Sequence, residues 1–483
     1  MLLVAAAALG LRMLGLDGRW LWFDELLSVN FANHGLFETL VTAARFDVHP
    51  PLYYLQLSMW MRFGQSDAYV ALDSVLWSLV AIAFVAATAA RLASRAAALA
   101  AALLLAAAPA AVLYSQQVRM YAFIMAWLAI ALWAWQRVVE RGRIADAIGA
   151  AAAVLVVVYS HGVGVVMASG VCMFPAIRLA GAGVRGRIGA LAVGYGLIVV
   201  GSLPAIGFSG SRGVLHTLTP SLADVALTLR EILFGWDSWL AAAPPAAATA
   251  VAAAISAFCL WSRASRAVFA CTVLMPVGAV LAISYAMTPI WLTRTIVVFV
   301  PFVALSLALA LDDVRAEWPR MSAAATATVV AALAAATIQQ QLSHRNGDDF
   351  RPAADFVRAH ARPGDAVYAG LGPYETWALL WYLGGPGWGT PLSFHDVNPA
   401  WRRMLDRIGE DWVRRLRLLP TQDAVRVGDL TVTSQFARPL EAEVARRLFV
   451  VRKLDLPEIR PEGRSLVDRV VLRQMTVELW ARP

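Results

Sequence analysis

Apolar stretches long enough to cross a lipid bilayer recur along most of this chain, with short charged segments between them. A spanning helix needs roughly 20 apolar residues, with about 17 as a practical minimum. Runs near that length fall at 1–16, 69–90, 96–113, 120–136, 144–159, 162–178, 188–208, 244–262, 267–287, 295–311 and 321–339. The pattern predicts a mostly α-helical, polytopic membrane protein with about 11 transmembrane helices.

Two further apolar segments suit helices at the membrane surface. The segment "HPPLYYLQLSMWMRFG" (49–64) is too short to span comfortably and begins with Pro-Pro, and 221–236 has an amphipathic pattern. We expect both at the outer interface, with aromatic side chains at headgroup depth. The alternative for 49–64 is a short true span, which would add one crossing.

Arginine positions predict the orientation. If the N-terminus is cytoplasmic, every inside loop is short and basic, as the positive-inside rule requires. These loops carry Arg91, Arg95, Arg137, Arg141, Arg143, Arg178, Arg185, Arg187, Arg263, Arg266, Arg315 and Arg320. The loops 17–68, 114–121 and 209–243 then lie outside, which in a bacterial inner membrane is the periplasmic side.

After residue 339 the sequence becomes charged and punctuated by Pro and Gly. The segment "DFRPAADFVRAHARPGDAVYAG" predicts a helix, a turn and a strand, while "LTVTSQF" and "RLFVVRKLDL" predict further strands. We therefore divide the chain into a transmembrane module, 1–339, and an outer soluble α/β domain, 340–483.

Composition supports lipid as the solvent. Hydrophobic residues make up 59% of the 483 residues and charged residues only 15%, and the mean hydropathy is +0.62. The net charge of +8 comes almost wholly from arginine, because Lys453 is the sole lysine. The sequence shows no basic face with interleaved aromatic residues, which is the pattern that would indicate nucleic-acid binding. No Walker motif, HExxH, CxxC or Rossmann fingerprint is present, which disfavours a soluble nucleotide donor.

Two adjacent carboxylates, Asp24 and Glu25, follow the first apolar run in "LWFDELLSVN", in the same outer loop as Asp47 and His49. A carboxylate near the bilayer is costly without a role. The pair suits a general base, a metal ligand or a clamp for a sugar hydroxyl. The alternative is a helix N-terminus, where acidic side chains cap free N–H groups.

Two arginines lie at outer span edges, against the charge rule. Arg119 is in "YSQQVRMY" (114–121) and Arg294 is in "PIWLTRTIVVFVP". A guanidinium at headgroup level suits a phosphate group, although an arginine reaching toward lipid phosphates gives the same pattern. His161 in "YSHGVG" is at another outer span end, where a single histidine is more often structural.

These motifs together resemble the GT-C fold glycosyltransferases, in the branch of the protein O-mannosyltransferases and the lipid A aminoarabinose transferase. The resemblance rests on Phe23-Asp24-Glu25, "DVHPPLYYLQL" (47–57), "YSQQVRMYA" (114–122), "YSHGVG" (159–164) and the late Arg294. The order and spacing match over roughly the first 300 residues. The tail is similar only through "DFRPAADFVRAHARPGDAV".

The resemblance implies transfer of a sugar, with inversion, from a polyprenyl-phosphate donor to a cell-envelope acceptor on the outer face. Asp24 corresponds to the base, and Glu25 joins it as a second catalytic candidate. Arg119 and Arg294 would hold the carrier phosphate. The remaining substrate-binding candidates are Asp47, His49, Tyr53, Tyr114, Gln117, Tyr121 and His161. Relatives usually have Glu where this chain has Gln117, so a carboxylate is lost from the hairpin. This departure argues against a metal site that uses position 117, and a divalent metal cofactor is left open.

Two other function classes compete with an enzyme. A lipid or sugar transporter would need charged or broken helices at mid-membrane, or an internal repeat. Pro175 and Pro276 lie within spans, but no repeat is visible. A scaffold would leave the acidic residues and arginines idle.

Overall fold

The computed structural model describes residues 1–179, 187–210, 219–343, 349–371, 373–384, 424–434 and 445–483. The chain forms two compact units. Unit 1 comprises Met1–Gly18 and Leu36–Arg345, and unit 2 comprises Arg19–Gly35 and Asn346–Pro483. The segment 19–35 therefore groups with the C-terminal residues, an association that the apolar pattern did not indicate.

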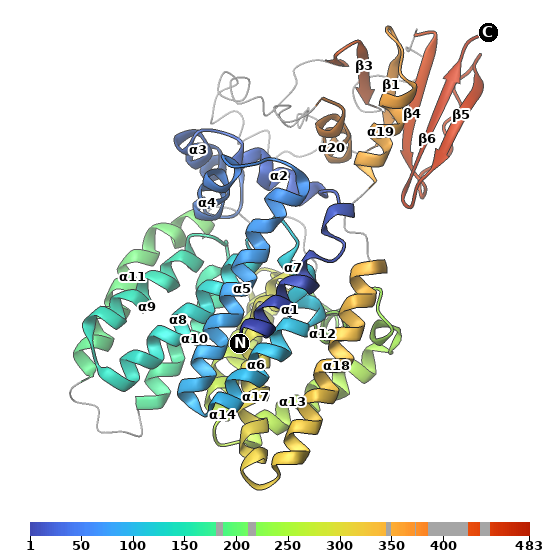
Figure 1. Ribbon diagram of the computed structural model, residues 1–483. Helices are drawn as coiled ribbons and strands as arrows, with labels where there is room; N and C mark the ends of the chain where they lie inside the picture. Colours follow the sequence, from blue (N-terminus) through green and yellow to red (C-terminus); the bar gives the residue numbers. More distant parts are fainter. Residues whose placement is uncertain (180–186, 211–218, 344–348, 372, 385–423, 435–444) are drawn as a thin grey trace. The chain divides into compact units, whose positions relative to one another are not determined.

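The regular secondary structure in the described part of unit 1 consists of helices (Figure 1). Its helices are α1 (Leu2–Met13), η1 (Leu16–Gly18), α3 (Leu36–Phe46), α4 (Leu52–Met61), α5 (Asp67–Leu92), α6 (Arg95–Ala107), α7 (Pro109–Ser115), α8 (Tyr121–Arg141), α9 (Ile144–Val158), α10 (Gly164–Leu179), α11 (Ile188–Gly210), α12 (Leu222–Phe234), η2 (Leu240–Ala242), α13 (Pro245–Trp261), α14 (Arg266–Phe269), η3 (Ala270–Leu274), α15 (Met275–Ala286), α16 (Thr293–Ile296), η4 (Val297–Phe299), α17 (Val300–Glu317) and α18 (Pro319–Ser343).

Each predicted apolar run falls on one or more of these helices. Within the described residues, six helical stretches are long and apolar enough to cross a membrane, and the bent pair α6–α7 makes a seventh if counted as one span. The helices α9, α10 and α13 are apolar but shorter. The mostly helical, polytopic prediction is confirmed, while the number of 11 crossings stays a prediction. Arg185 and residues 211–218 of the predicted second outer loop lie outside the described residues.

The short helices α4 and α12 occur where interfacial helices were expected. A ten-residue helix such as α4 rises about 15 Å, half the thickness of the hydrocarbon core. That length does not suit the alternative of a true span at 49–64.

Close helix packing in unit 1 centres on α5, α8, α9 and α11. Trp135 of α8 is completely buried, and its ring stacks on Tyr195 of α11 with centroids 5.1 Å apart. A Cβ atom at Gly194 would lie 2.7 Å from the Trp135 ring. Glycine at this position therefore allows α11 to approach α8.

A sharp break between α6 and α7, with a bend of 64°, interrupts one apolar run. Proline at position 109 has no N–H to continue the helical bonding. The carbonyl groups at the break accept bonds from other helices: Arg12 of α1 donates to Ala106 at 3.1 Å, and Thr337 of α18 donates to Ala107 at 2.7 Å. Gln340 donates to the Pro109 carbonyl at 3.0 Å and accepts from Trp236 N–H at 2.8 Å. The break is thus satisfied by protein groups rather than by water.

Unit 2 contains α2 (Phe23–Ala32), α19 (Phe350–His360), α20 (Pro373–Gly384) and a six-stranded mixed sheet of order β2-β3-β1-β4-β6-β5. The strands are β1 (Ala366–Gly370), β2 (Ala424–Val427), β3 (Leu430–Ser434), β4 (Arg447–Lys453), β5 (Ser465–Val471) and β6 (Met475–Ala481). Strand β1 is parallel to β3 and β4, and the other pairs are antiparallel. The predicted helix and strands of the tail fall on α19, β1, β3 and β4. Residues 435–436 of the predicted strand "LTVTSQF" lie outside the described ranges.

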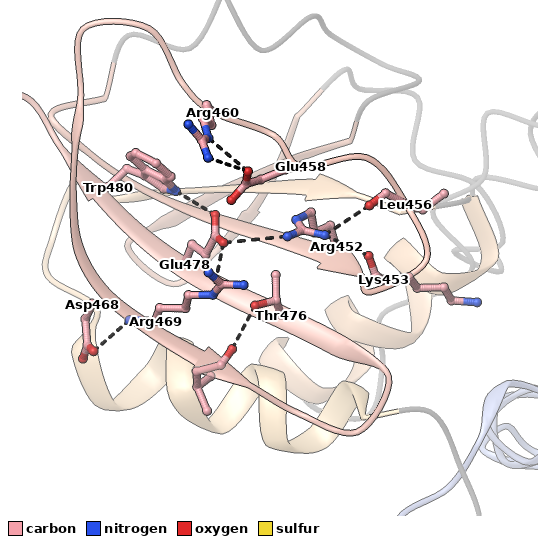
Figure 2. A network of polar contacts seen from close by, with 11 residues as sticks. Arg452, Lys453, Leu456, Glu458, Arg460, Asp468, Arg469, Thr476, Glu478 and Trp480 are labelled. Carbon is pink, nitrogen blue, oxygen red and sulfur yellow. Dashed lines mark hydrogen bonds and ion pairs between the residues drawn. The ribbon is translucent and has the colours of Figure 1, made fainter.

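The sheet carries a charged cluster on the face opposite α19, around Glu478 of β6 (Figure 2). Glu478 is 1% exposed and lies between Arg452 of β4, at 3.9 Å, and Arg469 of β5, at 3.4 Å. A buried carboxylate needs such partners because its desolvation is costly.

Gln340 gives a direct test of the α6–α7 break. The substitution Gln340→Leu removes both of its hydrogen bonds, and each buried backbone group left unsatisfied costs about 1–3 kcal/mol. We expect a fall of several degrees in the unfolding temperature of the detergent-solubilised protein.

The matched control is Gln339→Leu, because Gln339 is exposed and its bond to Trp239 N–H can be replaced by water. Equal melting temperatures for the two variants would contradict this account of the break.

Candidate functional site

Two turns of unit 1 that are far apart in the sequence are joined by hydrogen bonds. Leu52 N–H donates to the Tyr159 carbonyl at 3.1 Å, and Gly162 N–H donates to His49 Nδ1 at 3.2 Å. A Cβ atom on Gly162 would lie 2.9 Å from the Val48 carbonyl oxygen. Glycine is therefore what lets the 159–163 turn reach His49.

This contact pairs the two predicted histidines. The rings of His49 and His161 have centroids 4.3 Å apart, and His161 Nδ1 accepts from Val163 N–H at 3.2 Å. Since both Nδ1 atoms accept backbone bonds, each neutral ring carries its proton on Nε2. Each imidazole can then donate one hydrogen bond to a substrate.

Burial and positive charge keep both rings neutral. Burial lowers the pKa of His49 well below its ordinary value, and the charges of Arg119 and Arg294 lower it further. The pKa of His161 is lowered by burial, then by His49 and the same two arginines. Arg119 and Arg294, predicted separately from two motifs, therefore act on the same pair of rings.

The hairpin 114–121 is buried along its whole length. Ser74 Oγ donates to the Gln117 carbonyl at 2.5 Å, and Gln116 Nε2 donates to the carbonyl groups of Arg12 and Leu14 at 2.8 and 2.9 Å. Arg119 is only 4% exposed, so its guanidinium lies within protein. An arginine reaching out to bulk lipid is the alternative that this burial rules out.

Aromatic rings line the same region. Tyr114 and Tyr121 are in edge contact at 5.2 Å between centroids, and Tyr121 is 6.2 Å from the His161 ring. Tyr53 packs against Tyr54 at 5.6 Å and is fully buried. These rings exclude water and so strengthen the electrostatic interactions of the arginines.

Asp47 fixes the turn before His49. Its carboxylate accepts from Tyr54 Oη and from Val48 N–H, the latter at 2.7 Å. Burial raises the pKa of Asp47, opposed by the charge of Arg119, and the pKa of Tyr54 is raised well above its ordinary value by burial and by Asp47. The contacts of Asp47 are those of a positioning group.

One acidic residue near Arg294 was not among the sequence candidates. Glu231 of α12 accepts from Thr293 Oγ1 at 2.5 Å, and Thr293 directly precedes Arg294. The expected amphipathic helix at 221–236 located α12, but nothing in its pattern distinguished Glu231 from a solvated helix face.

Asp24 and Glu25 belong to unit 2, whereas the other nine candidates belong to unit 1. Glu25 is completely buried and accepts from the Arg19 guanidinium and, at 3.1 Å, from Trp22 N–H. It therefore caps the start of α2, which is the structural alternative raised above for the acidic pair. Asp24 is half-buried on the first turn of α2. The catalytic roles of both stay predictions.

The turn that precedes α2 is fixed by α20. Phe23 is in edge contact with Trp377 at 5.6 Å between centroids, and Leu21 N–H donates to Tyr382 Oη at 2.8 Å. Unit 2 thus holds Asp24 on a helix anchored to the C-terminal domain.

A divalent metal was left open as a cofactor. Among the described residues, no three His, Cys, Asp or Glu side chains are grouped as a ligand set. The Nδ1 atoms of His49 and His161 are already engaged by backbone N–H groups. These residues do not fit a metal site, which needs at least three protein ligands in the usual case.

Comparison with known proteins supplies the fold family. Residues 48–203 match the family model of dolichyl-phosphate-mannose-protein mannosyltransferase. The apo structure of ArnT from Cupriavidus metallidurans superposes with a TM-score of 0.60 at 15% identity, covering 99% of this chain and 97% of that one. The chain has the GT-C glycosyltransferase fold.

Two further GT-C structures are similar. ArnT from Cupriavidus metallidurans bound to undecaprenyl phosphate gives a TM-score of 0.57 at 13% identity, again covering 99% and 97% of the two chains. The arabinofuranosyltransferase AftD from Mycobacteria gives 0.50 at 16% identity, covering 99% of this chain and 39% of that one. No curated protein sequence matches significantly.

The neutral histidines predict a pH-dependent stability. Because the folded-state pKa values of His49 and His161 lie well below 6.5, the unfolded state binds more protons below that pH. The contribution of the two histidines to the free energy of unfolding is fully present above pH 6.5. It falls as the pH is lowered toward 5, by at most about 1.4 kcal/mol per pH unit for each histidine. Asp47 has a raised pKa in the folded state, so its contribution to the free energy of unfolding decreases as the pH rises.

The measurement is the unfolding temperature from pH 8 to pH 5 for the wild type and the double variant His49→Gln/His161→Gln. Asp47 is present in both proteins, so the difference isolates the histidines. We expect a flatter profile for the double variant, and parallel profiles would contradict the assignment.

Proposed function

We propose that this protein is an inverting glycosyltransferase that moves a sugar from a polyprenyl-phosphate carrier to an acceptor hydroxyl or phosphate. The observation that carries the proposal is the pairing of His49 and His161, whose ring centroids are 4.3 Å apart, with the charges of the buried Arg119 and of Arg294 acting on both rings. Two fixed cations and two N–H donors are the groups that a phosphate requires. A structure of ArnT, which shares the fold, binds undecaprenyl phosphate.

The transfer reaction requires a base for the acceptor and stabilisation of the leaving phosphate. The acceptor oxygen attacks the anomeric carbon as the bond from that carbon to the phosphate oxygen breaks, and the phosphate leaves with the bonding electron pair as polyprenyl phosphate. A base takes the acceptor proton. Phosphate is a good leaving group, so the main demands are that base and stabilisation of the charge left on the phosphate.

In this proposal Asp24 is the base, and Arg119 and Arg294 hold the phosphate. His49 and His161 donate from Nε2 to the same group, while Asp47 positions His49. Tyr53, Tyr114, Gln117 and Tyr121 line the substrate region. Glu25 supports Asp24 by closing the first turn of α2, because its carboxylate is committed to Arg19 and Trp22.

The location is part of the proposal. A carrier with a long isoprenoid tail stays in the bilayer, so a site at the end of the spans reaches its head without extracting it. We propose about 11 crossings of a bacterial inner membrane, with the site and residues 340–483 on the periplasmic side. The arginine-rich short loops support this orientation.

Asp24→Asn tests the base. A placed base contributes about 10²–10⁴-fold in rate, so we expect at least about a hundredfold loss of transfer with unchanged folding. The assay uses reconstituted vesicles and a panel of undecaprenyl-phosphate-linked sugars.

Asp17→Asn is the matched control, since Asp17 is an exposed aspartate nearby in the sequence. Turnover near wild type in Asp24→Asn would exclude Asp24 as the base. Movement of the lipid across sealed vesicles with no glycosylated product in the wild type would favour a flippase.

Arg119→Gln and Arg294→Gln test the phosphate site. Removing one charge from a desolvated, hydrogen-bonded ion pair costs about 2–5 kcal/mol, so each variant should bind undecaprenyl phosphate at least about thirtyfold more weakly.

The control is Arg320→Gln, an exposed arginine at the α17–α18 turn. If all three variants bind the lipid as the wild type does, Arg119 and Arg294 do not hold the phosphate.

A further inference from the structure

Glu231 is a carboxylate placed beside a cluster otherwise rich in positive charge. Its Oε2 accepts from Thr293 Oγ1 at 2.5 Å. Thr293 lies 3.4 Å from Thr228, which in turn accepts from the Trp291 indole at 3.1 Å. These bonds hold the second half of α12 against the segment that carries Arg294.

The second oxygen of Glu231 has no bonded partner within the described part of the chain, and the side chain is only half-buried. Both Glu231 and Arg294 act electrostatically on the Tyr114 phenol, whose ring contacts Tyr121 beside His161. The carboxylate therefore lies in the same region as Arg294 and Tyr114, and one of its oxygens is still able to act on a ligand.

The other charged or titratable groups near Glu231 are few. Of the elements packed against α12, α7 contributes Tyr114 and α16 contributes Arg294, while α13 carries only Cys259 and η2 carries none. On α12 itself the other charged residues are Asp224 and Arg230.

We propose that Glu231 is a charge-balancing residue that weakens the hold of the arginine site on the phosphate product, so that the product can leave. This inference rests on the proposed function. A polyprenyl-phosphate sugar is a diester with one negative charge, and the product is a monoester that reaches two, with a second pKa of about 6. Transfer therefore raises the negative charge in the site just when the lipid must be released.

A nearby carboxylate opposes that extra charge more than it opposes the donor. In a partly buried site, a nearby carboxylate weakens the binding of an anionic ligand roughly tenfold for each unit of the ligand's negative charge. Removing it should strengthen binding of the dianion more than binding of the monoanion.

The experiment measures the affinity of undecaprenyl phosphate itself, with no sugar, at pH 5.5 and pH 8 for wild type, Glu231→Gln, Thr293→Val and the control Glu317→Gln. Glu317 is exposed at the end of α17. Burial and the charges of Arg119 and Arg294 lower the pKa values of His49 and His161 well below 6.5. Each gain compares a variant with the wild type at one pH, so groups that titrate alike in both proteins cancel.

We expect Glu231→Gln to bind the lipid roughly a hundredfold more tightly at pH 8 and roughly tenfold more tightly at pH 5.5, and Glu317→Gln to match the wild type. Thr293→Val keeps the carboxylate and should not gain affinity. In steady-state transfer, kcat of Glu231→Gln should fall while KM falls with it.

Equal or weaker binding of the lipid by Glu231→Gln at pH 8 would overturn the charge role of Glu231. An equal gain in affinity at both pH values would overturn it as well. Either result would leave the glycosyltransferase proposal standing. Weaker binding by both Glu231→Gln and Thr293→Val would assign Glu231 to structure alone. Failure of the wild type to bind undecaprenyl phosphate would overturn the proposed donor and the charge role with it.

Discussion

Free carbonyl groups at a broken transmembrane helix must find protein partners, because the bilayer offers none. The break between α6 and α7 meets this requirement with side chains from two other helices, Arg12 of α1 and Thr337 and Gln340 of α18. The break redirects the chain into α7 and the buried 116–120 turn. Arg119 lies in that turn and is therefore buried within the protein. The position of Arg119 in the site thus depends on the hydrogen bonds that satisfy the α6–α7 break.

In the cluster of Arg119, Arg294, His49 and His161, different residues supply the positive charge and the additional hydrogen-bond donors. The arginines carry positive charge, and the same charge helps to keep His49 and His161 neutral. The histidines thus add donors without adding charge that a leaving phosphate would have to overcome. In our proposal, the carboxylate of Glu231 on α12 opposes part of this positive charge. This division suits a ligand that is anionic throughout and becomes more so during the reaction.

Much of this arrangement could be predicted from the sequence. Apolar run length located the helices of unit 1, and the turn residues of the tail located α19 and β1. The resemblance to the GT-C glycosyltransferases predicted both arginines and both histidines as site residues, because each lies in a short motif at a helix end. The burial of Arg119 and the pairing of the two rings could not be predicted, since both depend on contacts between segments far apart in the chain.

Two features gave no sequence signal at all. The association of 19–35 with the C-terminal residues rests on contacts such as Phe23 with Trp377, which no local pattern encodes. Glu231 looks like any acidic residue on an amphipathic helix until Thr293 is placed against it. The acidic pair shows the opposite case: Glu25 caps a helix, as elementary helix chemistry suggested, and in our proposal its neighbour Asp24 is the base.

The central claim is that the cluster of Arg119, Arg294, His49 and His161 is a phosphate site. An experimental density map of the protein in lipid with undecaprenyl phosphate tests it most directly. The account predicts the phosphate within hydrogen-bond distance of both guanidinium groups and of at least one imidazole Nε2. A phosphate bound elsewhere, for example at Arg95 or Arg320 with the cluster unoccupied, would contradict it.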